Sequence, residues 1–173
     1  DRHSSLIRFC QWQAKVQLGF NQELTLRYVE RFIQLDDNGS VWKDVVYFKL
    51  KQEFAINYTV EQLLSTYVQQ FHYFCISFPV VSVCMQQLDD LGYKLGLVSN
   101  GKTPFQERNF YALGIQQYFS TVIVSDAVGL RKPDPAIFYL ACEKLGVEAE
   151  RCVFVGDNKQ VDIEGAMQAG LSA

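Results

Sequence analysis

The sequence changes its pattern near Val80, and this change constrains the fold more than any other feature. Before it, apolar residues recur at helical spacing, as at Leu24, Tyr28 and Phe32. After it, short apolar runs alternate with helical stretches, which is typical of a parallel sheet with crossover helices. The three runs are 94–98, 121–124 and 152–155. The chain is therefore expected to contain an all-α part followed by an α/β part.

The predicted boundaries place an all-α domain over residues 4–78 and an α/β domain over 79–173. The helical part should hold four helices, with a stop at Asn38-Gly39 and a capping box from Thr59 to Gln62 opening the last one. Its many aromatic residues are best explained as core, because aromatics at helical spacing usually fill an interior.

Residues that commonly start and end helices are placed in the second part as the α/β prediction requires. Thr103 and Asp134 each precede a proline, and both are expected to cap helices. Glycines stand where these helices should end. They are Gly92, Gly114, Gly146 and Gly170.

Composition excludes several kinds of partner. The net charge is -3, from 16 basic and 19 acidic residues, without a Lys/Arg block that could follow a nucleic-acid backbone. The longest apolar stretch, 71–85, is interrupted by polar residues, so no membrane span is expected. The five cysteines are odd in number and well spread. We interpret them as reduced core thiols and expect a reducing, cytoplasmic location. The oligomeric state does not follow from the sequence.

Polar residues follow each predicted strand, at the edge where parallel sheets bind ligands. Ser99-Asn100-Gly101 ends the first, and its hydroxyl and backbone N–H groups suit phosphate oxygens. Taken alone, this triplet is more simply an ordinary turn. Lys132 follows the second strand in a loop stiffened by two prolines, where a fixed ammonium can neutralise a phosphate and a carboxylate. Asp134 is better explained as a helix cap than as a catalyst.

Asp157 ends the third predicted strand, and Asp162 follows five residues later at the opening of a helix. Two carboxylates are enough for Mg²⁺, which keeps water and substrate phosphate as its other ligands. For Asp162 alone, stabilisation of a helix N-terminus is the simpler explanation. His3 and His72 have no partner at metal spacing, so no zinc site is expected.

Taken together, three segments resemble the second, third and fourth motifs of the haloacid dehalogenase superfamily, in the same order. The segments are Leu97-Val98-Ser99-Asn100-Gly101, Gly129-Leu130-Arg131-Lys132-Pro133-Asp134-Pro135, and Val155-Gly156-Asp157 through Asp162. The resemblance covers the chain from about Val80 to its end. It implies a three-layer Rossmann-like parallel sheet in the α/β part, and an all-α cap domain before it.

The resemblance also implies a chemistry. An aspartate on the family's first strand attacks phosphorus, and water hydrolyses the aspartyl-phosphate. Ser99, Asn100 and Gly101 would bind the phosphoryl group, Lys132 would balance charge, and Asp157 would bind Mg²⁺ with Asp162 assisting. The expected activity is a phosphatase acting on a small phosphorylated metabolite.

The family's first motif, Asp-x-Asp-x-Thr, is not present in these 173 residues. Residues 1–3 resemble the connection that follows it, and we expect residues missing at both ends. Two alternatives remain open: a phosphoglucomutase-type phosphotransferase, which uses the same core, and an inactive relative that binds a ligand or partner. A dehalogenase is disfavoured, because such enzymes typically carry Ser-Asn in place of Gly156-Asp157.

Overall fold

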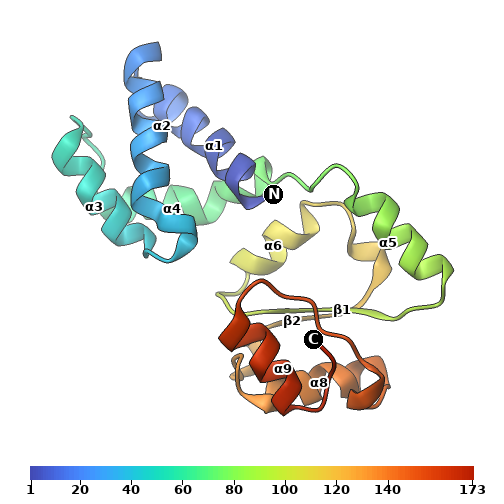
Figure 1. Cartoon of the computed structure of the whole chain (residues 1–173). Helices are drawn as coiled ribbons and strands as arrows, with labels where there is room; N and C mark the ends of the chain where they lie inside the picture. Colours follow the sequence, from blue (N-terminus) through green and yellow to red (C-terminus); the bar gives the residue numbers. More distant parts are fainter. The chain divides into compact units, whose positions relative to one another are not determined.

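The computed structural model describes residues 1–173, and the chain divides into two compact units, Asp1–Phe78 and Pro79–Ala173 (Figure 1). The first unit is entirely helical, and the second combines a parallel sheet with helices. The class predicted from the sequence, an α/β unit joined to an all-α unit, is confirmed.

The helical unit holds four α-helices, as predicted, joined by short irregular helical turns. The α-helices are α1 (Arg2–Trp12), α2 (Gln22–Asp36), α3 (Lys43–Glu53) and α4 (Val60–Gln70). The turns are η1 (Gln13–Gln17), η2 (Asp37–Gly39) and η3 (Phe71–Phe74).

Side-chain caps start three of these helices. The Asp1 carboxylate and the Asn21 side-chain amide oxygen accept backbone N–H groups at the starts of α1 and α2. At α4 the predicted capping box from Thr59 to Gln62 is present in both directions. The end of α2 near Asn38-Gly39 is also as predicted, because Asp37 and Asn38 adopt left-handed backbone angles there.

Aromatic rings fill the core of the helical unit, as predicted. Phe9 packs against Tyr67 and Phe71, and Tyr28 packs against Phe32 and Phe54, with most pairs tilted or edge-to-face. These rings are buried. Three aromatics expected in the core are instead exposed: Trp42, Phe48 and Tyr73.

The α/β unit consists of short elements around two strands. Its helices are α5 (Val81–Asp90), α6 (Phe105–Tyr111), α7 (Ser125–Val128), α8 (Pro135–Leu145) and α9 (Gly165–Gln168). Its strands are β1 (Leu95–Ser99) and β2 (Phe119–Val124). Shorter turns are η4 (Gln116–Tyr118), η5 (Ala149–Arg151) and η6 (Lys159–Glu164).

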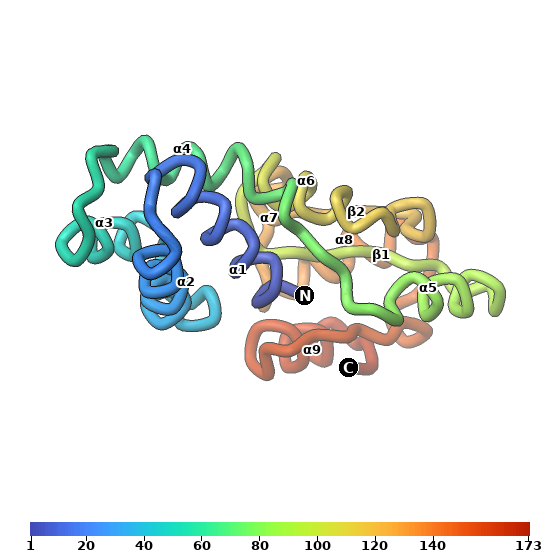
Figure 2. Tube along the Cα trace, turned by 90° about the horizontal axis from the view of Figure 1, so that it is seen from above, coloured from blue at the N-terminus to red at the C-terminus, as the bar shows by residue number.

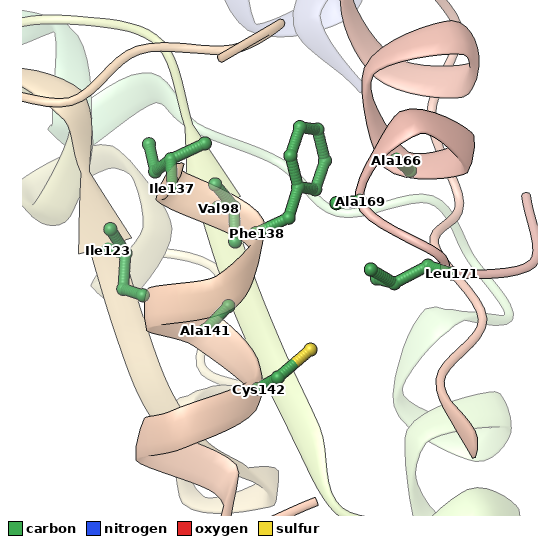
Figure 3. Packing of buried hydrophobic residues seen from close by; sticks show 9 residues of the cluster. All are labelled: Val98, Ile123, Ile137, Phe138, Ala141, Cys142, Ala166, Ala169 and Leu171. Carbon is green, nitrogen blue, oxygen red and sulfur yellow. The ribbon is translucent and has the colours of Figure 1, made fainter. Parts of the chain in front are cut away.

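Strands β1 and β2 pair in parallel, with Ser99 opposite Val124 at their carboxyl ends. Helix α8 lies on one side of them and α6 on the other (Figure 1). Apolar residues of β1, β2, α8 and the C-terminal segment form one core (Figure 3). The C-terminal residue lies beside α9 in both views (Figures 1 and 2).

The third predicted strand, over 152–155, does not form. Its only sheet-like contact is an isolated parallel bridge from Val153 to Ser172. Phe154 N–H donates to the Ser172 carbonyl at 2.7 Å, and Ser172 N–H donates to the Cys152 carbonyl at 3.0 Å. A strand needs a longer run of paired residues, and here Val153 and Val155 are 73% and 90% exposed.

The prediction that Thr103 caps a helix is also wrong. Helix α6 begins at Phe105, and Thr103 Oγ1 donates to the Glu107 carboxylate at 2.5 Å instead of accepting a backbone N–H. The expected cap at Asp134 is confirmed, since its carboxylate accepts Ala136 N–H at 2.9 Å and Pro135 opens α8.

No helix in residues 1–173 is both long and apolar enough to cross a membrane. All five cysteines are free thiols. Cys10 and Cys142 are buried and Cys75 and Cys152 are half-buried, but Cys84 is exposed, so the prediction of a core position is wrong for Cys84.

Candidate active site

The candidate site lies where β1 and β2 end side by side. Asn100, directly after β1, clamps the backbone of Lys132 with both polar atoms of its amide. Its Nδ2 donates to the Lys132 carbonyl at 2.8 Å, and its Oδ1 accepts Lys132 N–H at 2.9 Å. These two bonds join the first predicted loop to the second, 32 residues further along the chain.

Two further residues after β2 fasten the same pair of loops. Ser125 Oγ accepts Gly101 N–H at 3.0 Å. The sequence predicted that this N–H would be free to bind phosphate, but in the structure it already has a partner. The Asp126 carboxylate accepts Lys102 Nζ at 2.9 Å and Thr103 N–H at 3.3 Å. The loop from Ser125 to Lys132 was expected to lie at the ligand-binding edge, but no role was predicted for Ser125 or Asp126. Their place at a strand end was the available signal.

The side chain of Lys132 reaches the third loop. Its Nζ lies 2.7 Å from Asp162 Oδ1, in an ion pair whose side chains are only 11% and 8% exposed. The same ammonium lies 5.2 Å from the centre of the Phe154 ring. A buried charge needs such partners, because its desolvation is costly. Lys132 is therefore held in one position, as its stiff loop predicts.

Asp162 also binds the loop before it. Its Oδ2 accepts Asn158 N–H at 3.1 Å, while the buried Oδ1 has only the Lys132 ammonium. Burial works to raise the pKa of Asp162. The Lys132 ammonium and the backbone N–H groups of Asn158 and Asp157 outweigh burial, so the pKa of Asp162 is lowered from its usual value. Asp162 is thus an anion in the folded protein at neutral pH.

Two glycines allow these loops to approach closely. A side chain at Gly156 would meet Asp162 Cβ at 2.4 Å, and one at Gly165 would meet the Pro133 backbone at 3.0 Å. Gly156 therefore lets Asp162 fold back over its own loop, and Gly165 lets η6 and α9 pack against the loop that carries Lys132.

Asp157 and Ser99 differ from these residues, because neither side chain has a hydrogen-bond or ion-pair partner. Asp157 is exposed and Ser99 is half-buried. Direct contacts thus bring together Asn100, Lys132 and Asp162, while Asp157 is tied to them through its backbone N–H to Asp162. Ser99 is next to Asn100 in the chain and so lies at the same edge.

The residues present offer a partial set of ligands for Mg²⁺. The free Asp157 carboxylate is a hard oxygen donor, and Asp162 Oδ1 is buried with one partner. Residues 1–173 contain no group of three or more His, Cys, Asp or Glu side chains placed to hold a metal ion. The chemistry of the donors fits a magnesium ion that takes its other ligands from water and phosphate.

Comparison with protein families identifies the chain. The model of haloacid dehalogenase-like hydrolases matches residues 3–173, which is nearly the whole chain. The chain belongs to this family. The resemblance recognised from the three motifs is therefore confirmed, and the match also takes in the helical unit.

Among curated relatives, a glyceraldehyde 3-phosphate phosphatase of Methanopyrus kandleri is 40% identical over 94 residues. A phosphoglycolate phosphatase of Yersinia pestis is 43% identical over 93 residues, and a phosphoserine phosphatase of Thermus thermophilus is 35% identical over 96 residues. Each match takes in 54 to 56% of this chain and 39 to 40% of the relative. The matched part spans about two fifths of these relatives.

Solved structures agree on the fold. A haloacid dehalogenase-type phosphatase from Thermococcus onnurineus is 29% identical with a TM-score of 0.58, over 98% of this chain and 77% of that one. A putative hydrolase of the same family from Bacillus subtilis, solved with magnesium, has a TM-score of 0.71 at 20% identity, over 98% and 77% of the two chains. These likenesses support a Rossmann-like core with a helical cap.

Proposed function

We propose that the whole protein is a phosphatase that hydrolyses a small-molecule phosphate monoester with Mg²⁺. The observation that carries this proposal is the junction, through Asn100, Lys132 and Asp162, of the loops that follow β1 and β2 with the loop that follows residues 152–155, beside two polar side chains without partners. The three curated relatives named above are all phosphatases of small metabolites, which supports the same class of substrate.

Each residue has a chemical role in this proposal. The Ser99 hydroxyl donates a hydrogen bond to a phosphoryl oxygen, and Asn100 and Gly101 shape the turn that presents it. The Lys132 ammonium, held by Asp162, compensates the charge on the phosphoryl group without giving up its proton. Asp157, and Asp162 through water, would hold Mg²⁺. Bound there, the ion would neutralise negative charge on the phosphate.

The nucleophile in this proposal is an aspartate of the family's first motif, which is not among these 173 residues. Hydrolysis through an aspartyl-phosphate is therefore proposed for the complete protein, with the helical unit as the cap that excludes bulk water. A location in the cytoplasm stays a prediction.

Asn100 acts on Lys132 in this proposal and is a positioning residue. Its amide is already engaged at both polar atoms by the Lys132 backbone. Asn100→Asp keeps the acceptor for Lys132 N–H but sets an oxygen against the Lys132 carbonyl. This variant should lower kcat more than it raises KM, since a 1 Å displacement of a charge-stabilising group costs on the order of 10²-fold in rate.

The test is release of inorganic phosphate by the complete protein over a panel of phosphate monoesters, with and without Mg²⁺. Asp157→Asn should lower Mg²⁺-dependent turnover by about 10² to 10³-fold, the usual effect of losing one charge-stabilising contact. Asp134→Asn is the matched control. It makes the same carboxylate-to-amide change, and asparagine caps α8 equally well, so turnover should not change.

Two results would contradict the phosphatase proposal and favour one of the two alternative functions. Formation of a new phosphate ester from a sugar phosphate, without free phosphate, would favour the phosphotransferase. Absence of Mg²⁺-dependent turnover over the whole panel would favour a relative that binds a ligand or partner without catalysis.

A further inference from the structure

The α/β unit also contains two neighbouring thiols that the proposed function does not use. The Sγ atoms of Cys142, on α8, and Cys152, in the segment after η5, lie 3.7 Å apart. The Cys142 thiol donates to the Cys152 sulfur, and the Cys152 thiol donates to the Glu148 carbonyl at 3.3 Å. These weak bonds keep the two sulfurs facing each other.

Reagents can reach this pair from solvent. Cys152 is half-buried, and Cys142, although only 6% exposed, borders an open pocket of about 600 Å³. Glu148 and Ala169 line the same pocket. Figure 3 shows the Cys142 sulfur pointing away from α8, on the side of Leu171. No other pair of cysteine sulfurs in residues 1–173 is in contact.

We propose that Cys142 and Cys152 are a redox-sensitive dithiol, which closes to a disulfide on reaction with a small-molecule disulfide such as oxidised glutathione. A disulfide needs the sulfurs at about 2.05 Å, so closure requires α8 and the 152–155 segment to approach slightly. This segment makes only an isolated bridge to Ser172, and its Phe154 ring already packs against Phe138 of α8, with 5.0 Å between the ring centres. It leads directly into Gly156-Asp157, so the new bond would tether the base of that loop to α8.

The exchange takes place in two steps. Cys152, the more exposed thiol, loses its proton and attacks one sulfur of the reagent, which releases one glutathione thiol and leaves a mixed disulfide. Cys142 then loses its proton and attacks the Cys152 sulfur, which releases the second glutathione thiol. Two protein thiols are oxidised and one small disulfide is reduced. Burial raises the pKa of Cys142 to about 11, so the second step should be the slower one at neutral pH.

The experiment treats the reduced chain, carrying Cys84→Ser to remove the exposed thiol, with oxidised glutathione. Remaining thiols are alkylated, and intact mass and a peptide map are recorded. The expected result is the loss of two hydrogens and a cross-link between the peptides of Cys142 and Cys152. In the same background, Cys142→Ser should hold one glutathione at Cys152, and Cys152→Ser should leave Cys142 unmodified.

Two results would overturn the proposal. One is a glutathione adduct that stays on Cys152 although Cys142 is present, which would mean that the sulfurs do not reach each other. The other is no reaction at either residue under conditions in which the original Cys84 is fully modified. In that case the two thiols are simply packed as small apolar side chains.

Discussion

The two units differ in how many large side chains they bury wholly, since most of the largest fully buried side chains lie in the helical unit. In the helical unit, Phe9, Phe32 and Leu63 are wholly buried by partners within residues 1–78. In the α/β unit, helix α5 has no buried residue, and Val153 and Val155 are largely exposed. The helical unit therefore has a core of wholly buried side chains, although Trp42 and Phe48 are exposed on it, whereas in the α/β unit α5 and the 152–155 segment have few or no buried apolar side chains.

The difference follows from the kind of contact that each unit uses. Helices make their hydrogen bonds within the segment and need only a packed face, which neighbours in the chain supply. Strands make their hydrogen bonds with a neighbouring strand that can be distant in the chain, and the 152–155 segment pairs only with Ser172. The polar residues of the candidate site all lie in the unit with the less complete core. Its loops are joined by hydrogen bonds and one ion pair instead.

The largest expected effect on stability is in the helical core. Phe32→Ala removes a wholly buried ring and should lower the free energy of unfolding of that unit by about 3–5 kcal/mol. Both tryptophans, Trp12 and Trp42, lie in the helical unit, so their fluorescence during denaturant unfolding reports on it alone. Val155→Ala, at the exposed segment, is the contrasting variant and should leave this transition unchanged. Equal losses of unfolding free energy in Phe32→Ala and Val155→Ala would contradict the difference between the units.

A similar effect is expected from the ion pair of the α/β unit. Asp162→Asn leaves the Lys132 ammonium buried without a compensating charge, which costs about 3–5 kcal/mol. Hydrogen exchange of α8 and α9 should speed up, while tryptophan fluorescence should keep its transition. The double variant Lys132→Met with Asp162→Leu should recover much of the loss, since an apolar pair needs no compensation. Failure to recover would mean that the loop contacts, and not the charges, are limiting.

Acid should weaken the same pair. The folded pKa of Asp162 is lowered, so its stabilising contribution is fully present above the unfolded pKa of about 3.9 and is lost as pH falls through the folded value. The protection factors of the amides in α8 and α9, which compare the observed exchange with the intrinsic rate at each pH, should therefore fall below about pH 4. In Asp162→Asn this part of the pH dependence should disappear, but in the exposed-cap control Asp134→Asn it should remain.

Much of the arrangement could be predicted from sequence because its signals are local. Helical periodicity, the Thr59 capping box and the Asp134-Pro135 start each depend on a few neighbouring residues. The prediction of a strand over 152–155 used only its local apolar run. It was wrong because strand formation also depends on distant partners, and this segment has only the bridge to Ser172. The contacts of Ser125 and Asp126 were not predicted for the same reason, as their partners lie 23 or 24 residues away. The stiff loop that carries Lys132 could be predicted because the two prolines that follow Lys132 are a local signal.

The smallest expected effect separates a local signal that was right from one that was wrong. Thr59 caps α4, so Thr59→Ala should lower the free energy of unfolding of the helical unit by about 1 kcal/mol. Thr103 precedes α6 in a similar sequence but makes an exposed hydrogen bond to the Glu107 carboxylate, so Thr103→Ala should change stability by less than about 0.5 kcal/mol. Tryptophan fluorescence measures the first, and hydrogen exchange of α6 measures the second. A loss of stability at Thr103 as large as that at Thr59 would contradict this difference between the two threonines.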